Sequence, residues 1–273
     1  MLKTCILWLS FFFLFTNAVA GHPDSSGREV ENTAFQRGER LIFNAAYHSL
    51  LTGNITAGDA SLEIKPDVLS KDGQDVMIIE CIIKTRGVFN LFYKVENHYR
   101  SFVDEKSLAP LRFTRNIREG RYRREDDVTF DREKLLAYSD RDTIPTPPFV
   151  QDMLSALYFA RTFSRDAVIP GESIYLDFHM SDSVYVSRIL FEGREQIRTG
   201  LGTFNALRFR PQVQVGAIFD QPYPMTLWIS DDENKIPLLI ESGLKVGSVR
   251  LELRQFGGLK NPIDSFVPRR SPR

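Results

Sequence analysis

The sequence predicts an all-β protein built from antiparallel strands, with one helix packed against the sheet. Three observations predict this fold class. Apolar residues alternate with polar ones in several stretches, turn-forming residues separate these stretches, and one segment repeats its apolar residues at helical spacing. Alternation directs one face of each strand toward a core and the other toward water, which is typical of antiparallel sheets.

The alternating stretches run through most of the chain. Four of them are clear, at residues 41–47, 111–117, 174–180 and 249–253. A fifth, Val76–Ile83, is apolar almost throughout and is predicted to be the most buried strand. Glycine and acidic residues fall between the stretches, where they favour tight turns. The whole pattern predicts about twelve strands.

A single helix is predicted over residues 149–161. Its apolar residues recur at spacings of four and three, at Met153, Leu157 and Ala160. The prolines before it suit a helix start, with Thr146 as the candidate cap and Asp152 in the first turns. We expect this helix to pack across the sheet and to divide the strands into an N-terminal and a C-terminal group.

The first twenty residues have the parts of a cleavable signal peptide, which are a positive charge at Lys3, an apolar run to Phe15 and small residues before the cleavage site. An uncleaved anchor is the alternative, but a spanning helix needs about 20 apolar residues. We therefore expect cleavage after Ala20. The remaining divisions are predicted to be a flexible lead-in at 21–37, a single β-rich domain at 38–257 and a C-terminal tail at 258–273.

Charge and cysteine content narrow the classes of function. The chain has 35 basic and 35 acidic residues, and loss of Lys3 with the signal leaves 34 basic ones. Nothing in this overall balance requires nucleic acid or an acidic membrane as a partner. Only Cys81 remains after the signal is removed, so the domain must be stabilised by its core. We interpret Cys81 as a small core residue.

Several short sequence phrases together carry a family resemblance. In chain order they are Gly38-Glu39-Arg40-Leu41, Ala57-Gly58, Glu119-Gly120-Arg121-Tyr122 with Phe130-Asp131, Gln151-Asp152-Met153-Leu154-Ser155-Ala156, Trp228-Ile229-Ser230-Asp231-Asp232 with Pro237, and Val246-Gly247-Ser248. Over residues 38–256 the chain resembles a bacterial exported family catalogued as domain of unknown function 3108. The resemblance implies a periplasmic or cell-surface setting and a strongly curved antiparallel sheet, a half-barrel or incomplete barrel. It implies no catalytic residues.

Arginine and aromatic side chains are the candidate ligand-binding residues. The arginines on the polar phase of predicted strands are Arg112, Arg118, Arg208, Arg210 and Arg250, and the aromatic candidates are Tyr122, Tyr223 and Trp228. On a curved sheet, several guanidinium groups aimed into one concavity would suit an anionic glycan. The alternative is a solvated surface on which the arginines pair with neighbouring acids, each pair contributing about 0–1 kcal/mol. Most aromatic residues are expected to fill the core.

The sequence offers no specific catalytic or metal-binding motif. It has no nucleophile elbow, phosphate loop or dinucleotide fingerprint, and His22, His48, His98 and His179 lack metal-ligand spacing. We therefore expect no cofactor and no metal. A glycan hydrolase or lyase would need two carboxylates about 5–10 Å apart, and the sequence places no pair across a cleft.

The function predicted from the sequence is non-catalytic binding or carriage of a cell-envelope component, either a lipid in an apolar trough or an anionic glycan. The alternatives are an enzyme acting on envelope polysaccharide and a structural factor that docks a membrane partner. A curved sheet motivates the prediction, because its concave side can exceed what its own side chains fill. Ligand identity and oligomeric state stay open at this point.

Overall fold

The computed structural model describes residues 27–49, 53–71, 74–212, 221–244 and 247–268. Within them, sixteen strands form one antiparallel sheet in the order β10-β11-β12-β13-β14-β15-β1-β2-β4-β5-β6-β7-β8-β9, with β16 beside β12 and β3 beside β4. Pairing of β1 with β15 joins the two halves of the chain. In the described residues β9 and β10 do not pair, so the sheet is not closed into a barrel.

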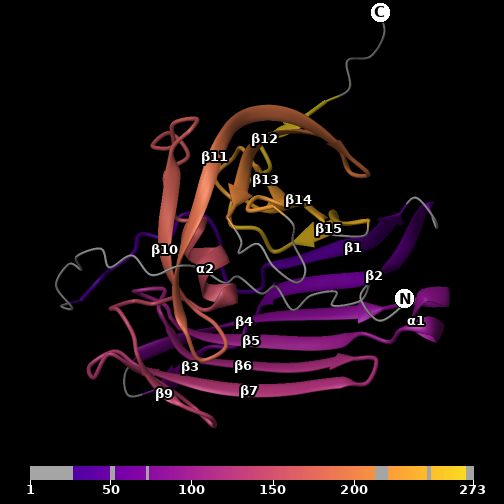
Figure 1. Ribbon diagram of the computed structural model, residues 1–273. Coiled ribbons are helices and arrows are strands. Elements are labelled where there is room, and N and C mark those ends of the chain that lie inside the picture. Colours follow the sequence, from indigo (N-terminus) through magenta and orange to yellow (C-terminus); the bar gives the residue numbers. More distant parts are fainter. Residues whose placement is uncertain (1–26, 50–52, 72–73, 213–220, 245–246, 269–273) are drawn as a thin grey trace, which may run out of the picture.

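The N-terminal half forms one group of strands, which lie side by side in Figure 1. They are β1 (Arg40–Ser49), β2 (Gly53–Ile64), β3 (Leu69–Lys71), β4 (Gln74–Thr85), β5 (Glu96–Asp104), β6 (Pro110–Glu119), β7 (Tyr122–Asp131), β8 (Leu136–Ser139) and β9 (Thr143–Pro145). The short helix α1 (Gly87–Phe92) lies between β4 and β5.

The C-terminal half forms the second group, in which β11 arches over its neighbours (Figure 1). Its strands are β10 (Ser173–His179), β11 (Val184–Thr199), β12 (Gly202–Pro211), β13 (Met225–Ser230), β14 (Pro237–Gly243), β15 (Ser248–Gly257) and β16 (Phe266–Val267). The all-β, open-barrel prediction is confirmed. The structure has four strands more than the expected twelve. This difference equals the number of very short strands, β3, β8, β9 and β16, which have two to four residues and are too short to show an alternating pattern.

Helix α2 (Met153–Ala160) lies between the two groups of strands, where one helix was predicted. Its N-cap is Asp152, whose carboxylate accepts hydrogen bonds from the backbone N–H groups of Leu154 and Ser155, while Ser155 bonds back to the cap. The expectation of Thr146 as the cap is wrong, because this reciprocal capping box satisfies the free N–H groups at Asp152. Helix α1 was not predicted, since six residues are too few to show helical spacing.

The alternation seen in the sequence corresponds to the two faces of the sheet. On β1, Leu41, Phe43 and Ala45 are buried and face α2's side, whereas Asn44 and Ala46 are on the opposite face. We call these the inner and outer faces. Apolar side chains of the inner face and α2 form the main core, and a second, smaller cluster forms around Phe191, Leu207, Phe209 and Ile229.

The segments before β1 and after β15 pack onto this body. Ala34 and Phe35 are completely buried, and the Phe35 ring meets Tyr158 of α2 edge to face at 4.9 Å. After β15, Ser265 is buried and β16 pairs with β12. These described residues therefore pack against the rest of the protein, whereas residues 21–37 were expected to be a flexible lead-in and residues 258–273 a C-terminal tail. The cause is the apolar contact of Phe35 together with the backbone pairing of β16.

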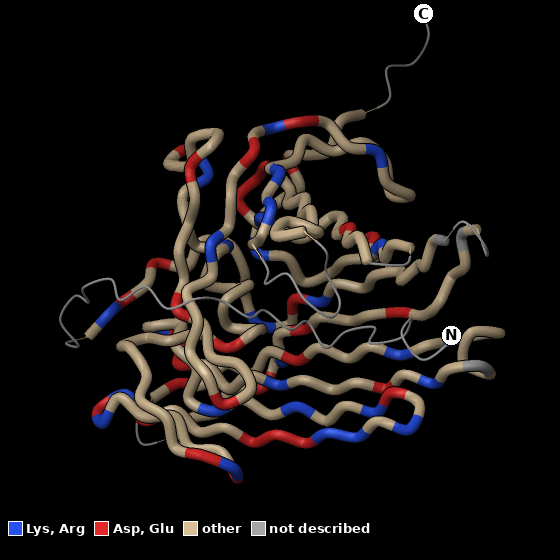
Figure 2. Tube along the Cα trace, viewed as in Figure 1, with Lys and Arg blue, Asp and Glu red and all other residues tan. Residues whose placement is uncertain are grey.

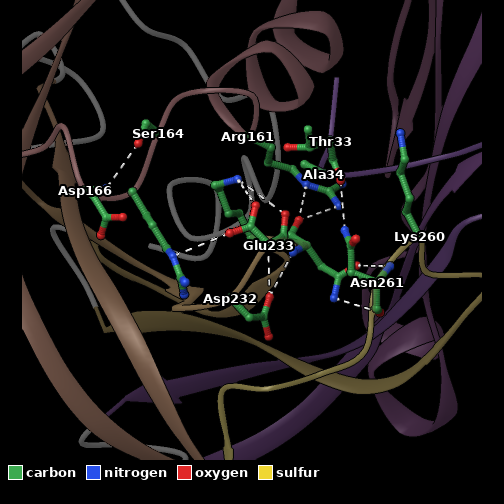
Figure 3. A network of polar contacts seen from close by, with 12 residues as sticks. Thr33, Ala34, Arg161, Ser164, Asp166, Asp232, Glu233, Lys260 and Asn261 are labelled. Atoms are coloured by element: carbon green, nitrogen blue, oxygen red, sulfur yellow. Dashed lines mark hydrogen bonds and ion pairs between the residues drawn. The ribbon is translucent and has the colours of Figure 1, made fainter. Parts of the chain in front are cut away.

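A buried ion pair ties α2 to both ends of the described chain (Figure 3). Arg161 and Glu39 are fully buried and form a two-pronged pair, with nitrogen–oxygen distances of 2.6 and 2.7 Å. Arg161 also donates to the Asn234 carbonyl at 2.8 and 3.0 Å. Burial opposes the charge, but the Glu39 carboxylate outweighs it and raises the pKa of Arg161. Asn234 in turn bonds to Asn261, which bonds to Thr33.

Substituting Arg161→Met is expected to lower the free energy of unfolding by about 3–5 kcal/mol, because Glu39 is left buried without a partner. The measurement is urea unfolding followed by circular dichroism. The double variant Arg161→Met/Glu39→Gln should recover part of the loss, since it removes both charges. As a control, Arg112→Ala disrupts an exposed pair and should cost about 0–1 kcal/mol. Equal losses at both arginines would contradict this account.

Asp152 should make stability depend on pH. Burial raises its pKa from 3.8 to about 6, against the hydrogen bonds that it accepts from Ser101, Leu154 and Ser155. The folded state therefore holds this proton more tightly than the unfolded state, so stability contributed by Asp152 at low pH is lost as the pH rises through about 4–6. Relative to wild type, Asp152→Asn should gain on the order of 2–3 kcal/mol between pH 4 and pH 7. Unfolding curves across this range test it, and a constant difference would contradict it.

Candidate functional site: an apolar cavity beside helix α2

The main candidate site is a cavity of about 120 Å³ between α2 and strands β10 to β13. The apolar side chains that line it are Ala156, Leu157, Ala160, Phe163, Val168, Ile174, Leu176, Ile189, Leu207, Phe209, Leu227 and Ile229, and the polar ones are Arg161, Ser164, Arg165 and Lys235. Nearly all of its wall is therefore hydrocarbon. A pocket with such a wall accepts apolar ligands.

The cavity exists because two apolar surfaces face each other without meeting. Leu154 and Tyr158 of α2 are buried in the main core, Leu157 packs against that core and also lines the cavity, and Ala156 and Ala160 line the cavity opposite β10–β13. Across the gap, β12 and β13 present the second apolar cluster. Two of the three helix residues are alanines, and their short side chains leave the space between the clusters unfilled.

Lys235 is the only lysine among the described residues of the cavity wall. It lies in the turn after β13, its side chain is 7 % exposed, and burial lowers the pKa of its amine. Its ammonium donates to the Glu233 carbonyl at 3.3 Å, and the Glu233 carboxylate lies 3.9 Å away on a half-exposed side chain. An ammonium has three donors, so this buried charge is weakly satisfied.

Arg165 lies at the edge of the same cavity and is better paired. It donates to the Asp231 carbonyl at 3.0 Å and lies 3.7 Å from the carboxylates of Asp231 and Glu233. Asp232 and Glu233 of this turn belong to the same polar network as Arg161, which Figure 3 shows. The site thus combines an apolar chamber with cationic groups at one edge. Such an arrangement can hold a chain-like apolar ligand that ends in an anionic group.

The five arginines predicted to bind a ligand lie on the outer face and bind acids or amides. Arg112 pairs with Asp127, Arg208 and Arg210 with Glu192, and Arg250 with Glu241 and Glu252, while Arg118 bonds to the Asn116 side chain. The hydrogen bond between Arg112 and Asp127 raises the pKa of the arginine and lowers that of the acid. The described residues therefore match the alternative of a solvated, self-paired surface.

The structure does not bring these arginines into one concavity. Arg112 and Arg118 are on β6, five strand positions from Arg250 on β15. At about 4.8 Å between strands this is roughly 24 Å along the sheet. Arg208 and Arg210 are on β12, a further three positions away. A shared anionic-glycan site built by all five would have to extend over this whole stretch of the sheet.

The three predicted aromatic residues are also separated. Trp228 donates from its indole nitrogen to Glu195 at 2.7 Å and stacks beneath Arg208, with 5.6 Å from the guanidinium to the ring centre. Tyr223 lies beneath Arg210 at 5.5 Å. Tyr122 is exposed at the β6–β7 turn, far from both along the sheet. Trp228 and Tyr223 therefore extend the ionic surface of β12 and β13, and Tyr122 belongs to a different place.

An open polar groove of about 740 Å³ crosses the outer face of β1, β2 and β13–β15. Its carboxylates are Glu241 and Glu252, and both accept hydrogen bonds from Arg250, at 2.5 and 2.8 Å. A glycan hydrolase needs one carboxyl group that is protonated and one that is free. Two carboxylates held by the same guanidinium are poorly suited to these roles, so the groove gives the enzyme alternative little support.

Two other features fall short of a site. A hollow beside His179 and Asp126 measures about 20 Å³, which is room for little more than one water molecule. Burial lowers the pKa of His179 to about 4, so it is neutral at pH 7.

Burial also raises the pKa of the unpaired Cys81 thiol to about 12, which makes it a poor nucleophile. In the part of the chain that the structure describes, no group of His, Cys, Asp or Glu could hold a metal ion.

The sequence identified some of the cavity wall but not the cavity. Ile174 and Leu176 were recognised as the apolar phase of a strand and Leu157 and Ala160 as the apolar side of the helix. Their meeting across a gap depends on tertiary placement. Lys235 was missed altogether, and its one sequence signal is a lysine between the acidic turn 231–234 and the apolar stretch 236–240. Neither described helix is long and apolar enough to cross a membrane.

Comparison with known proteins agrees with this fold. A family model described as protein of unknown function DUF3108 matches residues 43–254. A solved beta-barrel-like protein of domain of unknown function DUF1849 from Brucella abortus is 11 % identical, with a TM-score of 0.55 over 82 % of this chain and 99 % of that one. At this identity the likeness concerns the fold alone. No curated protein matches the chain.

Two further solved structures were found at lower similarity. One is a candidate lipoprotein from Parabacteroides distasonis, 10 % identical with a TM-score of 0.35, covering 84 % of this chain and 99 % of that one. The other is a candidate exported protein with a YmcC-like fold from Bacteroides fragilis, 11 % identical with a TM-score of 0.33 over the same shares. Scores this low carry no argument about the present chain.

The substitution Ala160→Leu tests whether the cavity is empty space. The larger side chain should fit, so the free energy of unfolding should stay unchanged or rise by up to about 1 kcal/mol. The matched control is Ala206→Leu, at a fully buried alanine of the main core, where overpacking should cost about 1–3 kcal/mol. Chemical denaturation of both variants measures this. Equal destabilisation of the two variants would show that the space beside α2 is filled.

Proposed function

We propose that this chain, which belongs to the DUF3108 family of proteins of unknown function, is an exported, non-catalytic binding or carrier protein for a lipid of the cell envelope. The observation that carries the proposal is the apolar cavity between α2 and β10–β13. At about 120 Å³ it is comparable to the apolar cavity of about 150 Å³ that binds benzene in an engineered protein, so it can accept one segment of an acyl chain.

The cationic edge of the cavity favours a ligand with an anionic head group. An acyl chain seated against Leu207, Phe209 and Leu227 would leave its polar end free to reach Lys235 or Arg165. A ligand carboxylate would supply a further acceptor to the buried ammonium of Lys235, which already donates to the Glu233 carbonyl, and a single negative charge matches one ammonium. A fatty acid, or a lipid that carries one free carboxylate, is the class of ligand that fits best.

The other candidate functions have less support. A glycan-binding face would need free guanidinium groups on neighbouring strands, whereas four of the five predicted arginines already pair with carboxylates. An envelope hydrolase would need two independent carboxyl groups facing one cleft. The carrier proposal requires neither, because binding in an apolar cavity depends on shape and hydrocarbon contact.

Export rests on the N-terminal sequence, which lies outside the described residues. We propose that residues 1–20 direct the chain out of the cytoplasm and are cleaved after Ala20, leaving a protein that acts in the periplasm or at the cell surface. We also propose that residues 38–257 are one domain. The pairing of β1 with β15 supports this, because it makes the two halves parts of one sheet.

Binding of palmitate and hexadecanol, measured by native mass spectrometry and by titration calorimetry, tests the proposal. Palmitate should bind with a stoichiometry of one, and hexadecanol should bind several-fold more weakly because it lacks the anionic group. Ala160→Leu should abolish binding of both by filling the cavity. The control Ala167→Leu adds the same side chain at an exposed position outside the cavity and should leave binding unchanged.

A third variant distinguishes the contribution of the apolar cavity to binding from the contribution of its cationic edge. Lys235→Met should remove the preference for palmitate while leaving hexadecanol binding intact. Failure of wild-type protein to bind either compound, or equal binding by Ala160→Leu, would contradict the carrier proposal. Palmitate and hexadecanol binding equally to wild type would contradict only the role of Lys235.

A further inference from the structure

One end of the sheet combines exposed apolar and basic side chains, and it is separate from the cavity. Helix α1 and the β6–β7 turn lie side by side there (Figure 1). The backbone N–H of Gly120 donates to the Lys94 carbonyl at 2.8 Å, and Val95 bridges to Glu119. We call this end, made of residues 84–94 and 118–123, the α1 tip.

The apolar residues of the α1 tip are unusually exposed. Val88 is 69 % exposed, Leu91 is 83 % exposed and Tyr122 is 43 % exposed. Leu91 is thus almost wholly in water, on a helix of six residues that reaches beyond the strand ends. Large apolar side chains gathered at one exposed place mark a surface that is covered in use.

The α1 tip is also strongly basic, although the whole chain is neutral. Its basic residues are Lys84, Arg86, Lys94, Arg118, Arg121 and Arg123. Figure 2 shows several blue segments, which mark Lys and Arg, around this end of the sheet. The nearby carboxylates are few. Glu96 pairs with Lys84 and Lys94, Asp59 pairs with Arg86, and Glu119 is buried.

Two arginines of the α1 tip, Arg121 and Arg123, have no acidic partner among the described residues. Arg123 bonds to the carbonyls of Gly120 and Tyr122, which are neutral acceptors, whereas Arg118 bonds to the Asn116 side chain and also interacts with the charge of Glu96. Arg121 is exposed and forms no ion pair with a described carboxylate. This distinguishes Arg121 and Arg123 from Arg112, Arg208, Arg210 and Arg250. Their positive charge is therefore available to a partner.

We infer that the α1 tip docks onto an anionic lipid surface, with Val88 and Leu91 entering the interface and the arginines contacting lipid phosphates. The apolar and the basic side chains of the α1 tip then both meet a complementary surface, since an anionic bilayer has hydrocarbon beneath a layer of negative charge. An anionic glycan or a nucleic acid would use the arginines but leave Val88 and Leu91 in water. The short apolar surface flanked by charge suits a reversible contact.

Vesicle co-sedimentation of the purified protein tests this inference. The protein should bind vesicles of phosphatidylcholine with phosphatidylglycerol, bind pure phosphatidylcholine far less, and lose affinity as salt is raised. Leu91→Asp and the double variant Arg121→Glu/Arg123→Glu should each weaken binding by roughly tenfold or more. Ile169→Asp is the matched control, because Ile169 is 57 % exposed but lies outside the tip, and its binding should equal that of wild type.

Three results would overturn the inference. They are absence of binding to the anionic vesicles, an equal loss in Ile169→Asp, and concentration-dependent dimerisation in sedimentation velocity that Leu91→Asp abolishes, which would make a second copy the occupant. Circular dichroism spectra confirm that each variant is folded. The test of this inference is independent of the carrier proposal, since none of these variants changes a residue that lines the cavity.

Discussion

The buried pair between Arg161 and Glu39 is the interaction on which the arrangement of this protein depends. A charge of either sign alone in that position would cost several kcal/mol. It is tolerable because each partner is held in place from several directions. Glu39 immediately precedes β1, Arg161 immediately follows α2, and the carbonyl of Asn234 comes from the turn after β13. A single ionic contact thus fixes the helix relative to both halves of the sheet, across 122 residues of sequence.

The fixed position of α2 explains why one part of the interior is filled with side chains while another part contains a cavity. The helix fills the concave side above β4 and β5, where Asp152 accepts a hydrogen bond from Ser101. It cannot also fill the side below β10–β13, because the ion pair and the cap hold both of its ends. The alanines on that side leave an apolar gap. A cavity maintained by polar anchors at each end of a helix is a stable feature, since collapsing it would require breaking a buried charge pair.

The sequence predicted what depends on local pattern and missed what depends on distant contacts. Alternation located the long strands, and helical spacing located α2. Short elements such as β16 and α1 escaped, because two to six residues cannot show a period. Phe35 was assigned to the flexible lead-in, and its burial depends on distant contacts such as the one with the Tyr158 ring. The arginines were seen as one group, but strand order separates them, and strand order cannot be read from a single sequence.

The two functional proposals rest on positive charges that lack the carboxylate partners found elsewhere on the sheet. On the outer face, arginines such as Arg112 and Arg250 meet carboxylates on their own or the next strand, which keeps a wide polar surface neutral and soluble. Two places depart from that rule. Lys235 is buried against hydrocarbon with a weak partner, and Arg121 and Arg123 of the α1 tip are exposed with no partner among the described carboxylates. Because ion pairing is so general on this sheet, the exceptions are the positions where an outside molecule can complete the charge balance.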